Sequence, residues 1–210
     1  MRIESVKQEP DRAGRFWITL EDGTRMGLYR QTVEDFGLYP GLELTETEWN
    51  TLRENAGKMS AKMRAVRIVA ASAVSKKDLQ QRLVQKGEDP RQAAEAVAWM
   101  EEMNLVDDAE TARQIISRCI GKGYGLQRAK QALYEKKIPK QYWDDALADY
   151  PDQNEHILSY LRSHISNSRD QKAVKKAMDA LLRRGHSYGQ IHSALRQMNV
   201  VEDFQEESYG

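Results

Sequence analysis

The chain repeats itself, and this internal similarity limits the possible folds more than any other property of the sequence. Residues 78–87 (DLQQRLVQKG) are matched in character by residues 128–137 (RAKQALYEKK) and 176–185 (KAMDALLRRG), at separations of 50 and 48 residues. A second block, residues 103–108 (MNLVDD), returns as residues 198–203 (MNVVED). Self-similarity at a fixed period is typical of repeat architectures, in which each copy buries its apolar face against a neighbour.

Helix start and stop signals recur from residue 45 onward. Thr45 and Glu48 have the spacing of a capping box, in which each side chain satisfies a backbone donor of the other residue's turn. Further start signals are Ser75 with Asp78, Asp89 before Pro90, Asp107, Ser168 and Ser187, and stop signals are Gly87, residues 121–123 and Gly185. This spacing predicts helices of about 10 to 15 residues joined by short turns.

The first 30 residues differ from the rest and read as strands. Residues 15–20 (RFWITL) and 25–29 (RMGLY) are β-favouring runs, and Asp22-Gly23 between them is a good hairpin turn. Residues 2–6 add a third strand, because a lone hairpin is only marginally stable in water. A short helix over residues 31–36 follows.

The fold predicted from these signals is mainly α, with tandem three-helix repeats forming an elongated curved body and a small N-terminal β-sheet element. In the third repeat, Ala173, Val174, Ala177, Leu181 and Leu182 share one helix face that must meet a neighbour. The expected boundaries are 1–44 for the strands and short helix, 45–60 for a connecting helix, 61–106, 107–151 and 152–205 for the three repeats, and 206–210 for an acidic tail.

Charge is balanced overall but unevenly distributed along the chain. The sequence has 32 basic and 32 acidic residues, yet eight Lys or Arg and only one acid, Glu135, lie between Arg113 and Lys140. A second basic run follows, with seven basic residues and two acids between Arg162 and Arg184. Zero net charge argues against a globally steered nucleic-acid binder, whereas local clusters of this kind can neutralise phosphates.

The sequence offers little for catalysis, metal binding or membrane insertion. Cys119, the one cysteine, lies on an apolar stripe and is expected to pack in the core. The four histidines lack the spacing of a metal site, and the glycines of residues 121–125 are expected to form a helix-to-helix turn rather than a nucleotide loop. No signal peptide or membrane span is recognisable, so we expect a cytoplasmic protein without cofactor, metal or catalytic residues.

The chain resembles the RecX family of recombinase regulators. The resemblance covers most of residues 61–140 and rests on three motifs in order: Ser75…Asp78-Leu79…Leu83…Lys86-Gly87, then Leu105-Val106-Asp107-Asp108…Ala112-Arg113, then Arg118…Lys122-Gly123-Tyr124-Gly125…Arg128…Leu133…Lys136-Lys137-Ile138. The chain departs from the family pattern at residues 71–73, where members carry an arginine, and at residues 110–111, where they carry an aromatic residue.

The resemblance implies a monomeric protein, active in DNA repair and the SOS response, that binds RecA within its filament on DNA. Such a protein restrains RecA's ATP hydrolysis, strand exchange and co-protease activity, and binds naked DNA weakly and without base preference. On this reading the candidate residues for contact with DNA or the filament are Arg113, Arg118, Lys122, Arg128, Lys130, Lys136 and Lys137 in the second repeat, and Lys172, Lys175, Lys176, Arg183 and Arg184 in the third. Tyr124, Tyr134 and Tyr188 are too scattered to form a base-stacking ladder.

Two other classes of function remain open at this point. In a transcription regulator one three-helix repeat would act as a helix-turn-helix, and such a protein would show sequence preference on duplex DNA. In a scaffold without a nucleic-acid role, the basic faces would be ordinary solvated surface. An enzyme is the least favoured class.

Overall fold

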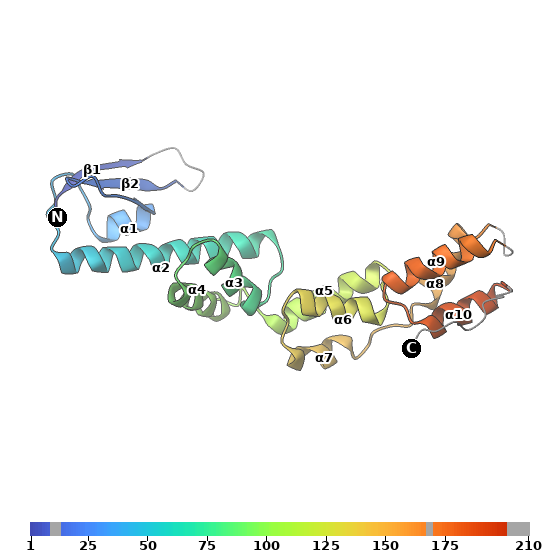
Figure 1. Ribbon diagram of the computed structural model, residues 1–210. Helices are drawn as coiled ribbons and strands as arrows, with labels where there is room; N and C mark the ends of the chain where they lie inside the picture. The colour runs from blue at the N-terminus through green and yellow to red at the C-terminus, as the bar shows by residue number, and fades with distance from the viewer. Residues whose placement is uncertain (9–13, 167–169, 201–210) are drawn as a thin grey trace. The chain divides into compact units, whose positions relative to one another are not determined.

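The computed structural model describes residues 1–8, 14–166 and 170–200, which form mostly helices after a small N-terminal sheet (Figure 1). The chain divides into two compact units, here called the first unit (Met1–Asp107) and the second unit, which begins at Asp108. The mainly helical fold with an N-terminal β element is therefore confirmed. None of the helices in the described part of the chain combines the length and apolar content needed to cross a bilayer.

The N-terminal sheet is antiparallel with strand order β1 (Ile3–Gln8), β2 (Phe16–Leu20) and β3 (Arg25–Leu28). The predicted turn joins β2 to β3: Gly23 has φ +84°, and Thr24 donates its N–H to Asp22 Oδ1 at 2.8 Å. The short helix α1 (Arg30–Asp35) follows the sheet. Alternation along the strands buries one face of the sheet, because period-2 side chains point the same way.

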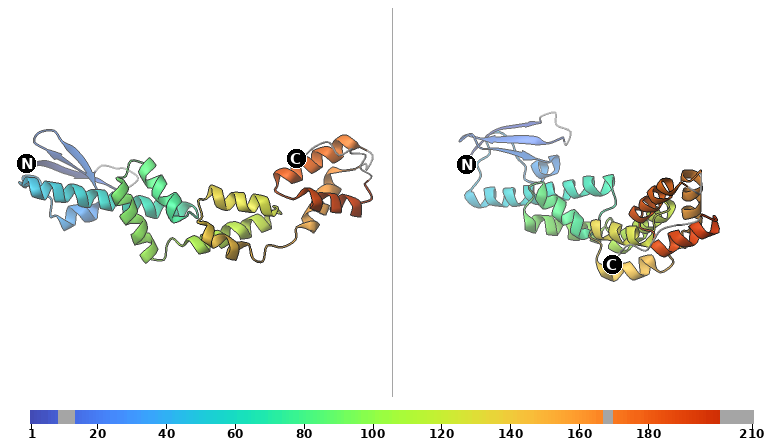
Figure 2. Two further views of the ribbon diagram at one scale, coloured as in Figure 1. Left: turned by 60° about the horizontal axis from the view of Figure 1, so that its bottom comes forward. Right: turned by 45° about the vertical axis from the view of Figure 1, so that its right-hand side comes forward.

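Helix α2 (Glu46–Ala71) is one continuous element of 26 residues that serves two cores. Its first half carries Trp49 and Leu52 into the core of the sheet, and its second half carries Ala61 and Ala65 into the core of α3 (Lys76–Gln85) and α4 (Pro90–Glu102). Figure 2 shows α2 running from the sheet to these two helices. The helix thus passes without interruption through residue 60, where the sequence suggested a boundary.

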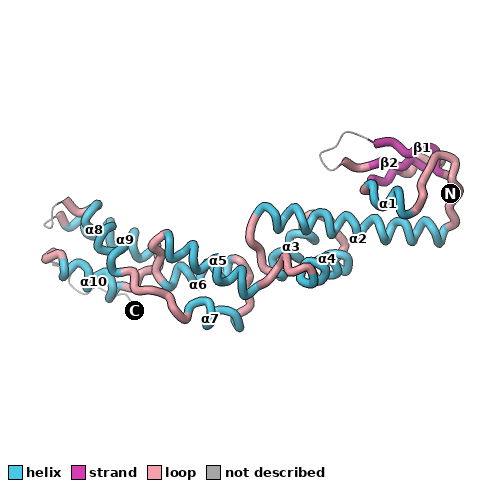
Figure 3. Tube along the Cα trace, turned by 180° about the vertical axis from the view of Figure 1, so that it is seen from behind, coloured by secondary structure: helices cyan, strands magenta, loops and turns pink. Residues whose placement is uncertain are grey.

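The second unit contains six helices and one 3₁₀ turn in its described residues, grouped around two cores (Figure 3). The first core is built by α5 (Asp108–Gly121), α6 (Leu126–Glu135), the turn η1 (Lys140–Tyr142) and α7 (Trp143–Leu147). The second is built by α8 (Asn154–His164), α9 (Gln171–Arg183) and α10 (Tyr188–Gln197). Pro139 precedes η1, and the last helix of the first group is only five residues long.

The internal repeat is visible in the way α3, α6 and α9 end. After each helix one residue has positive φ, and the N–H of the residue after it donates to the carbonyl of a buried leucine five residues earlier, in the last turn of the helix. This is the Schellman arrangement, which satisfies carbonyls left over at a helix end. The positive-φ residues are Gly87 (+88°), Lys137 (+55°) and Gly185 (+85°), and the leucines are Leu83, Leu133 and Leu181.

Most predicted helix starts lie where the sequence places them, and one helix face differs from expectation. Thr45, Ser75, Asp89 and Ser187 each accept a hydrogen bond from the first turn of a helix. Ser168 lies outside the described residues, and α9 is capped by Asp170 instead. Leu182 was expected on the buried face of α9 but is 39% exposed, while Met178 is buried at 7%, because the face that meets α8 and α10 is centred on Val174, Met178 and Leu181.

The helix ends generate a test of backbone strain. Adding a methyl group at Gly87 meets no atom within 4 Å, so Gly87→Ala should lower the free energy of unfolding by about 1 kcal/mol through strain alone. Lys137→Gly should change the free energy in the opposite direction, by up to about 1 kcal/mol, because lysine is strained at φ +55°. Urea unfolding of both variants measures this, and a shift of both in the same direction would contradict the strain argument.

Candidate nucleic-acid interface

The candidate basic residues of α5 lie on its exposed side. Arg113 and Arg118 are exposed and, with Glu110, Gln114 and Ser117, line a depression of about 360 Å³. Arg113 pairs with Glu110 at 2.9 Å. Lys122 follows the helix, its N–H donates to the Arg118 carbonyl at 3.1 Å, and its ammonium lies 5.9 Å from the Tyr124 ring centroid. This hydrogen bond holds Lys122 directly beyond the last turn of α5, which carries Arg118.

On α6, one basic residue is tied to the single acid of this stretch. Arg128 Nη1 lies 2.9 Å from Glu135 Oε1, and the Gln131 amide donates to the same oxygen at 3.3 Å. The hydrogen bond with Glu135 raises the pKa of the Arg128 guanidinium, and the same bond lowers the pKa of the Glu135 carboxyl. Lys130 is fully on the exposed side, and Lys136 and Lys137 follow the helix half-buried.

The candidates of the third repeat are exposed along α9. Lys172, Lys175, Lys176 and Arg183 all face solvent, and none of them forms an ion pair with a described residue. Arg184 stacks instead, with its guanidinium carbon 4.7 Å from the ring centroid of Tyr160, and that ring stacks in turn on His164 at 4.0 Å. The basic side chains of α9 are thus available to an anionic partner.

The turn before α6 and the first turn of that helix pack against the turn after α9, and this contact is here called the junction (residues 123–128 and 184–186). The Gly125 N–H donates to the Arg184 carbonyl at 2.9 Å, and the Gln127 N–H donates to the Gly185 carbonyl at 3.2 Å. The backbones are so close that a Cβ on Gly125 would lie 2.1 Å from the Gly185 oxygen. The junction also brings the backbone of Arg128 against Gly185, since a Cβ on Gly185 would lie 2.2 Å from the Arg128 nitrogen.

His186 completes the junction from within. Its side chain is 3% exposed, and Nε2 donates to the Gly123 carbonyl at 3.0 Å, because a carbonyl can only accept. Burial lowers the pKa of His186, with smaller contributions in the same direction from Arg184 and His156. Nδ1 is buried without a hydrogen-bond partner, so the neutral ring fits this position and a second ring proton would be left unsatisfied.

The turn before α6 is fixed on its other side by Tyr150. The Tyr150 hydroxyl donates to the Tyr124 carbonyl at 2.6 Å, and burial raises the pKa of Tyr150 to about 12. Cys119 is 6% exposed within the same core, and burial raises the pKa of its thiol. The glycines of residues 121–125 thus form a helix-to-helix turn, as predicted, and Gly125 has the further role of admitting the neighbouring backbone.

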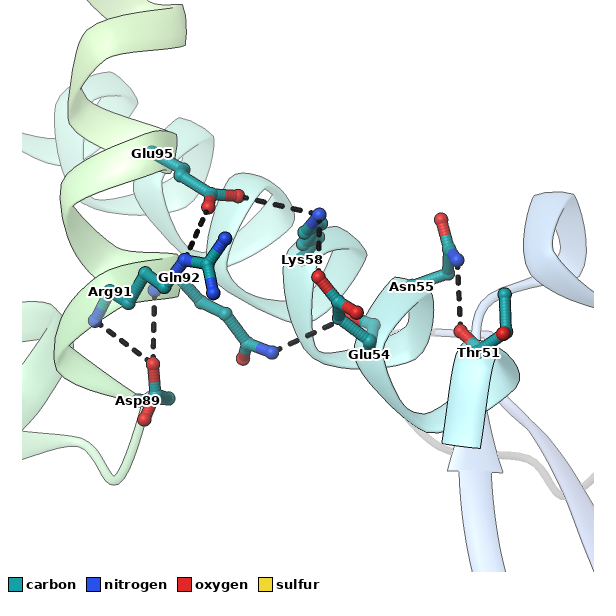
Figure 4. A network of polar contacts seen from close by, with 8 residues as sticks. All are labelled: Thr51, Glu54, Asn55, Lys58, Asp89, Arg91, Gln92 and Glu95. Atoms are coloured by element: carbon teal, nitrogen blue, oxygen red, sulfur yellow. Dashed lines mark hydrogen bonds and ion pairs between the residues drawn. The ribbon is translucent and has the colours of Figure 1, made fainter. Parts of the chain in front are cut away.

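In the first unit, several basic residues are paired with acids. Lys58 on α2 lies 2.9 Å from Glu54 and 3.8 Å from Glu95 on α4, and Arg91 lies 3.3 Å from Glu95 (Figure 4). Arg64 pairs with the buried carboxylate of Glu88, which also accepts from Ser60. Such pairs neutralise the positive charge of the residues that form them. In the described part of the chain, no three His, Cys, Asp or Glu side chains gather as metal ligands would.

Comparison with known proteins identifies the family. A regulatory protein RecX from Chlorobaculum tepidum is 31% identical over 143 residues, which cover 66% of this chain and 88% of the relative. The chain belongs to the RecX family. A regulatory protein RecX from Clostridioides difficile is 25% identical over 209 residues and covers 97% of both chains. No family-wide sequence profile matches.

Solved structures show the same fold. A crystal structure of regulatory protein RecX covers 94% of this chain with a TM-score of 0.61 at 18% identity, and one of RecX from Lactobacillus salivarius covers 69% with a TM-score of 0.59 at 18% identity. The RecX family comprises regulatory proteins, so the family predicted from the sequence is confirmed. The contact residues predicted for this RecX-family chain stay a prediction, since they concern a partner.

The junction of this RecX-family protein can be tested with a glycine pair. Gly125 has φ −75°, which any residue adopts, so Gly125→Ala acts only through its clash with the Gly185 carbonyl and should cost about 1–3 kcal/mol of unfolding free energy. Gly121→Ala is the matched control, because it sits at the end of α5 with no atom within 4 Å and should be neutral or slightly stabilising. Equal stability of the two variants in urea unfolding would contradict the assigned contact.

The buried imidazole predicts a pH dependence. A lowered folded-state pKa means that the unfolded chain binds a proton first, so stability is fully present above the unfolded value of 6.5 and falls as pH drops from there towards the folded pKa. The unfolding free energy should therefore decline below about pH 6.5, and less steeply in His186→Gln. His164→Gln, at an exposed histidine, is the control and should keep the parent's slope.

Proposed function

We propose that this chain is a non-catalytic, monomeric regulator of RecA that binds the RecA filament on DNA and restrains ATP hydrolysis, strand exchange and co-protease activity. Family membership supports RecA as the partner. The observation that carries the contact mode is the set of exposed basic side chains on α5, α6 and α9 that form no ion pair with a described residue: Arg118, Lys130, Lys172, Lys175, Lys176 and Arg183.

The charge distribution supports contact with phosphates rather than with bases of a duplex. Residues 108–200 carry 16 basic and 10 acidic side chains, and Glu135, the acid within the basic stretch, is occupied by Arg128. Lysine and arginine contacts to phosphates release condensed counterions, so binding falls with salt by a slope of about 0.7 per phosphate on single strands. Such contacts position a protein without specifying sequence.

Lys137 adds an independent argument for function at this surface. In the described residues it is the one residue other than glycine or asparagine with positive φ, and the other two repeats have glycine at this position. Strained backbone persists where a side chain is needed. A lysine kept in place of glycine after α6 supports a role for its ammonium in binding.

Charge reversal tests the proposal. The triple variant is Arg118→Glu, Lys122→Glu and Lys130→Glu. Arg128 is left unchanged, because a glutamate there would repel Glu135, the ion-pair partner of Arg128. We expect the triple variant to inhibit RecA ATPase on single-stranded DNA at least tenfold less strongly than the parent, since each lost phosphate contact reduces affinity. The measurement is ATPase rate against regulator concentration at several salt concentrations.

The matched control changes the same charge on the first unit: Arg53→Glu, Lys77→Glu and Lys86→Glu alter three exposed cations that form no ion pair with a described residue. It should inhibit like the parent. If the triple variant on the second unit also inhibited like the parent, the basic surface would have no part in the mechanism. Competition between DNA duplexes of different sequence separates the proposed function from that of a helix-turn-helix transcription regulator. Such a regulator would bind some of the duplexes more tightly than others.

A further inference from the structure

One position of the repeat exposes an apolar side chain every time. The residue after the buried leucine of the Schellman turn is Val84 in the first repeat, Tyr134 in the second and Leu182 in the third, and these are 38%, 68% and 39% exposed. Tyr134 has the largest exposed fraction among the large apolar side chains of the described residues. Of the three copies the second alone carries an aromatic ring here, and such a ring offers a flat apolar face to a partner.

The surroundings of Tyr134 are cationic. Leu126, Lys130 and Tyr134 follow one another at four-residue spacing along the exposed side of α6, here called the α6 ridge. Four residues of helix rise about 6 Å, so the ammonium of Lys130 and the ring of Tyr134 can reach neighbouring groups of one ligand. Lys136 and Lys137 follow directly in the chain.

Negative charge is absent from the ridge itself. Glu135, the one acid of α6, is held by Arg128 at 2.9 Å and by Gln131 at 3.3 Å, and hydrogen bonding to Arg128 keeps its carboxyl ionised and occupied. A ligand that complements the ridge therefore presents a flat apolar face beside an anion. A nucleotide with an unpaired base has both, whereas the bases of a duplex have their faces covered by their neighbours.

We propose that the α6 ridge binds single-stranded DNA, with an unpaired base stacked on the Tyr134 ring and an adjacent phosphate on Lys130. The inference rests on the proposed function in placing this protein on a RecA–DNA filament, and it deepens it from phosphate contact to base contact. Stacking tolerates every base, because each has a π face, so the ridge binds without sequence preference. Lys137, beyond the end of α6, extends the cationic side of the site.

The test compares a fluorescent oligo-dT with an abasic oligomer of the same length, using the full-length protein. Tyr134→Ala should weaken oligo-dT binding by about fivefold to a hundredfold, the range for losing one base–aromatic stack, and leave abasic binding unchanged. Tyr134→Phe should bind like the parent, because the ring is kept. Lys130→Gln should weaken both oligomers equally and lower the salt slope by about 0.7.

Tyr39→Ala is the matched control, since Tyr39 is 58% exposed on the first unit and should matter for neither oligomer. Tyr134 is exposed, so its substitution leaves the core of α6 intact, and circular dichroism confirms the fold of each variant. The inference is overturned if Tyr134→Ala binds oligo-dT like the parent, or if it loses the same factor on both oligomers. Loss of RecA inhibition with unchanged oligo-dT binding also overturns it, because the ring would then contact the RecA protein.

RecA ATPase measured on the same variants separates the two proposals. If the parent leaves RecA unaffected while Tyr134→Ala selectively loses oligo-dT, the proposed function fails and the stacking site stands. If the parent inhibits RecA and Tyr134→Ala behaves like the parent in every assay, the stacking site fails and the proposed function stands.

Discussion

The second unit depends on a direct backbone-to-backbone contact between two turns that are far apart in sequence. The N–H groups of Gly125 and Gln127 donate to the carbonyls of Arg184 and Gly185. In the other direction, the His186 ring donates to the Gly123 carbonyl. Each buried backbone group that finds a partner in this way avoids a penalty of about 1–3 kcal/mol, whereas side-chain packing alone would leave these groups unsatisfied. The contact holds only because Gly125 and Gly185 lack a Cβ, and it places Arg128 of α6 beside the turn that carries Arg184.

The repeat preserves backbone geometry, while one side chain per copy adapts to what lies beside it. The residue after each positive-φ position is buried in all three repeats: Glu88 at 8%, Ile138 at 4% and His186 at 3%. Glu88 binds Arg64 and Ser60 of α2, Ile138 packs in the core of α5 to α7, and His186 reaches the Gly123 carbonyl. An apolar residue is the ordinary choice at this point of a Schellman turn, so the two ionisable residues show where a copy is tied to a specific polar neighbour.

Local signals made much of the fold predictable, because caps and turns depend on residues within one or two helical turns. Thr45 with Glu48, Ser187 with Gln190, and the glycines after α3 and α9 act as their sequence patterns predict. What the pattern could not show depends on contacts across the chain. The exposure of Leu182 depends on which face of α9 is covered by α8 and α10. Position 125 needs glycine because the backbone of Gly185, 60 residues later in the sequence, lies against it.

The same distinction applies to the candidate interface. The clustering of basic residues is visible in the sequence, but the ion pair between Arg128 and Glu135 is not. The exposure of Tyr134 is also hidden, because the tyrosines look scattered along the chain although this one lies on the exposed side of α6 near Lys130. Lys137 could have been noticed from the sequence, since it occupies a repeat position where the other copies have glycine.

Zero net charge does not prevent such a protein from recognising a polyanion, because charge acts locally in salt. The Debye length is about 8 Å at physiological ionic strength, so a phosphate near α6 or α9 senses the side chains within a few ångströms and little of the rest of the molecule. In the first unit several of those neighbours are mutual ion pairs such as Lys58 with Glu54, whereas Lys172, Lys175, Lys176 and Arg183 on α9 form no ion pair with a described residue. If these exposed cations bind phosphate as proposed, the protein's zero net charge would limit its attraction to DNA in general. On the proposed function such a balance would favour the filament over naked DNA, since weak phosphate contacts alone would not hold the protein on DNA and contacts to the protein part of the filament would add to them.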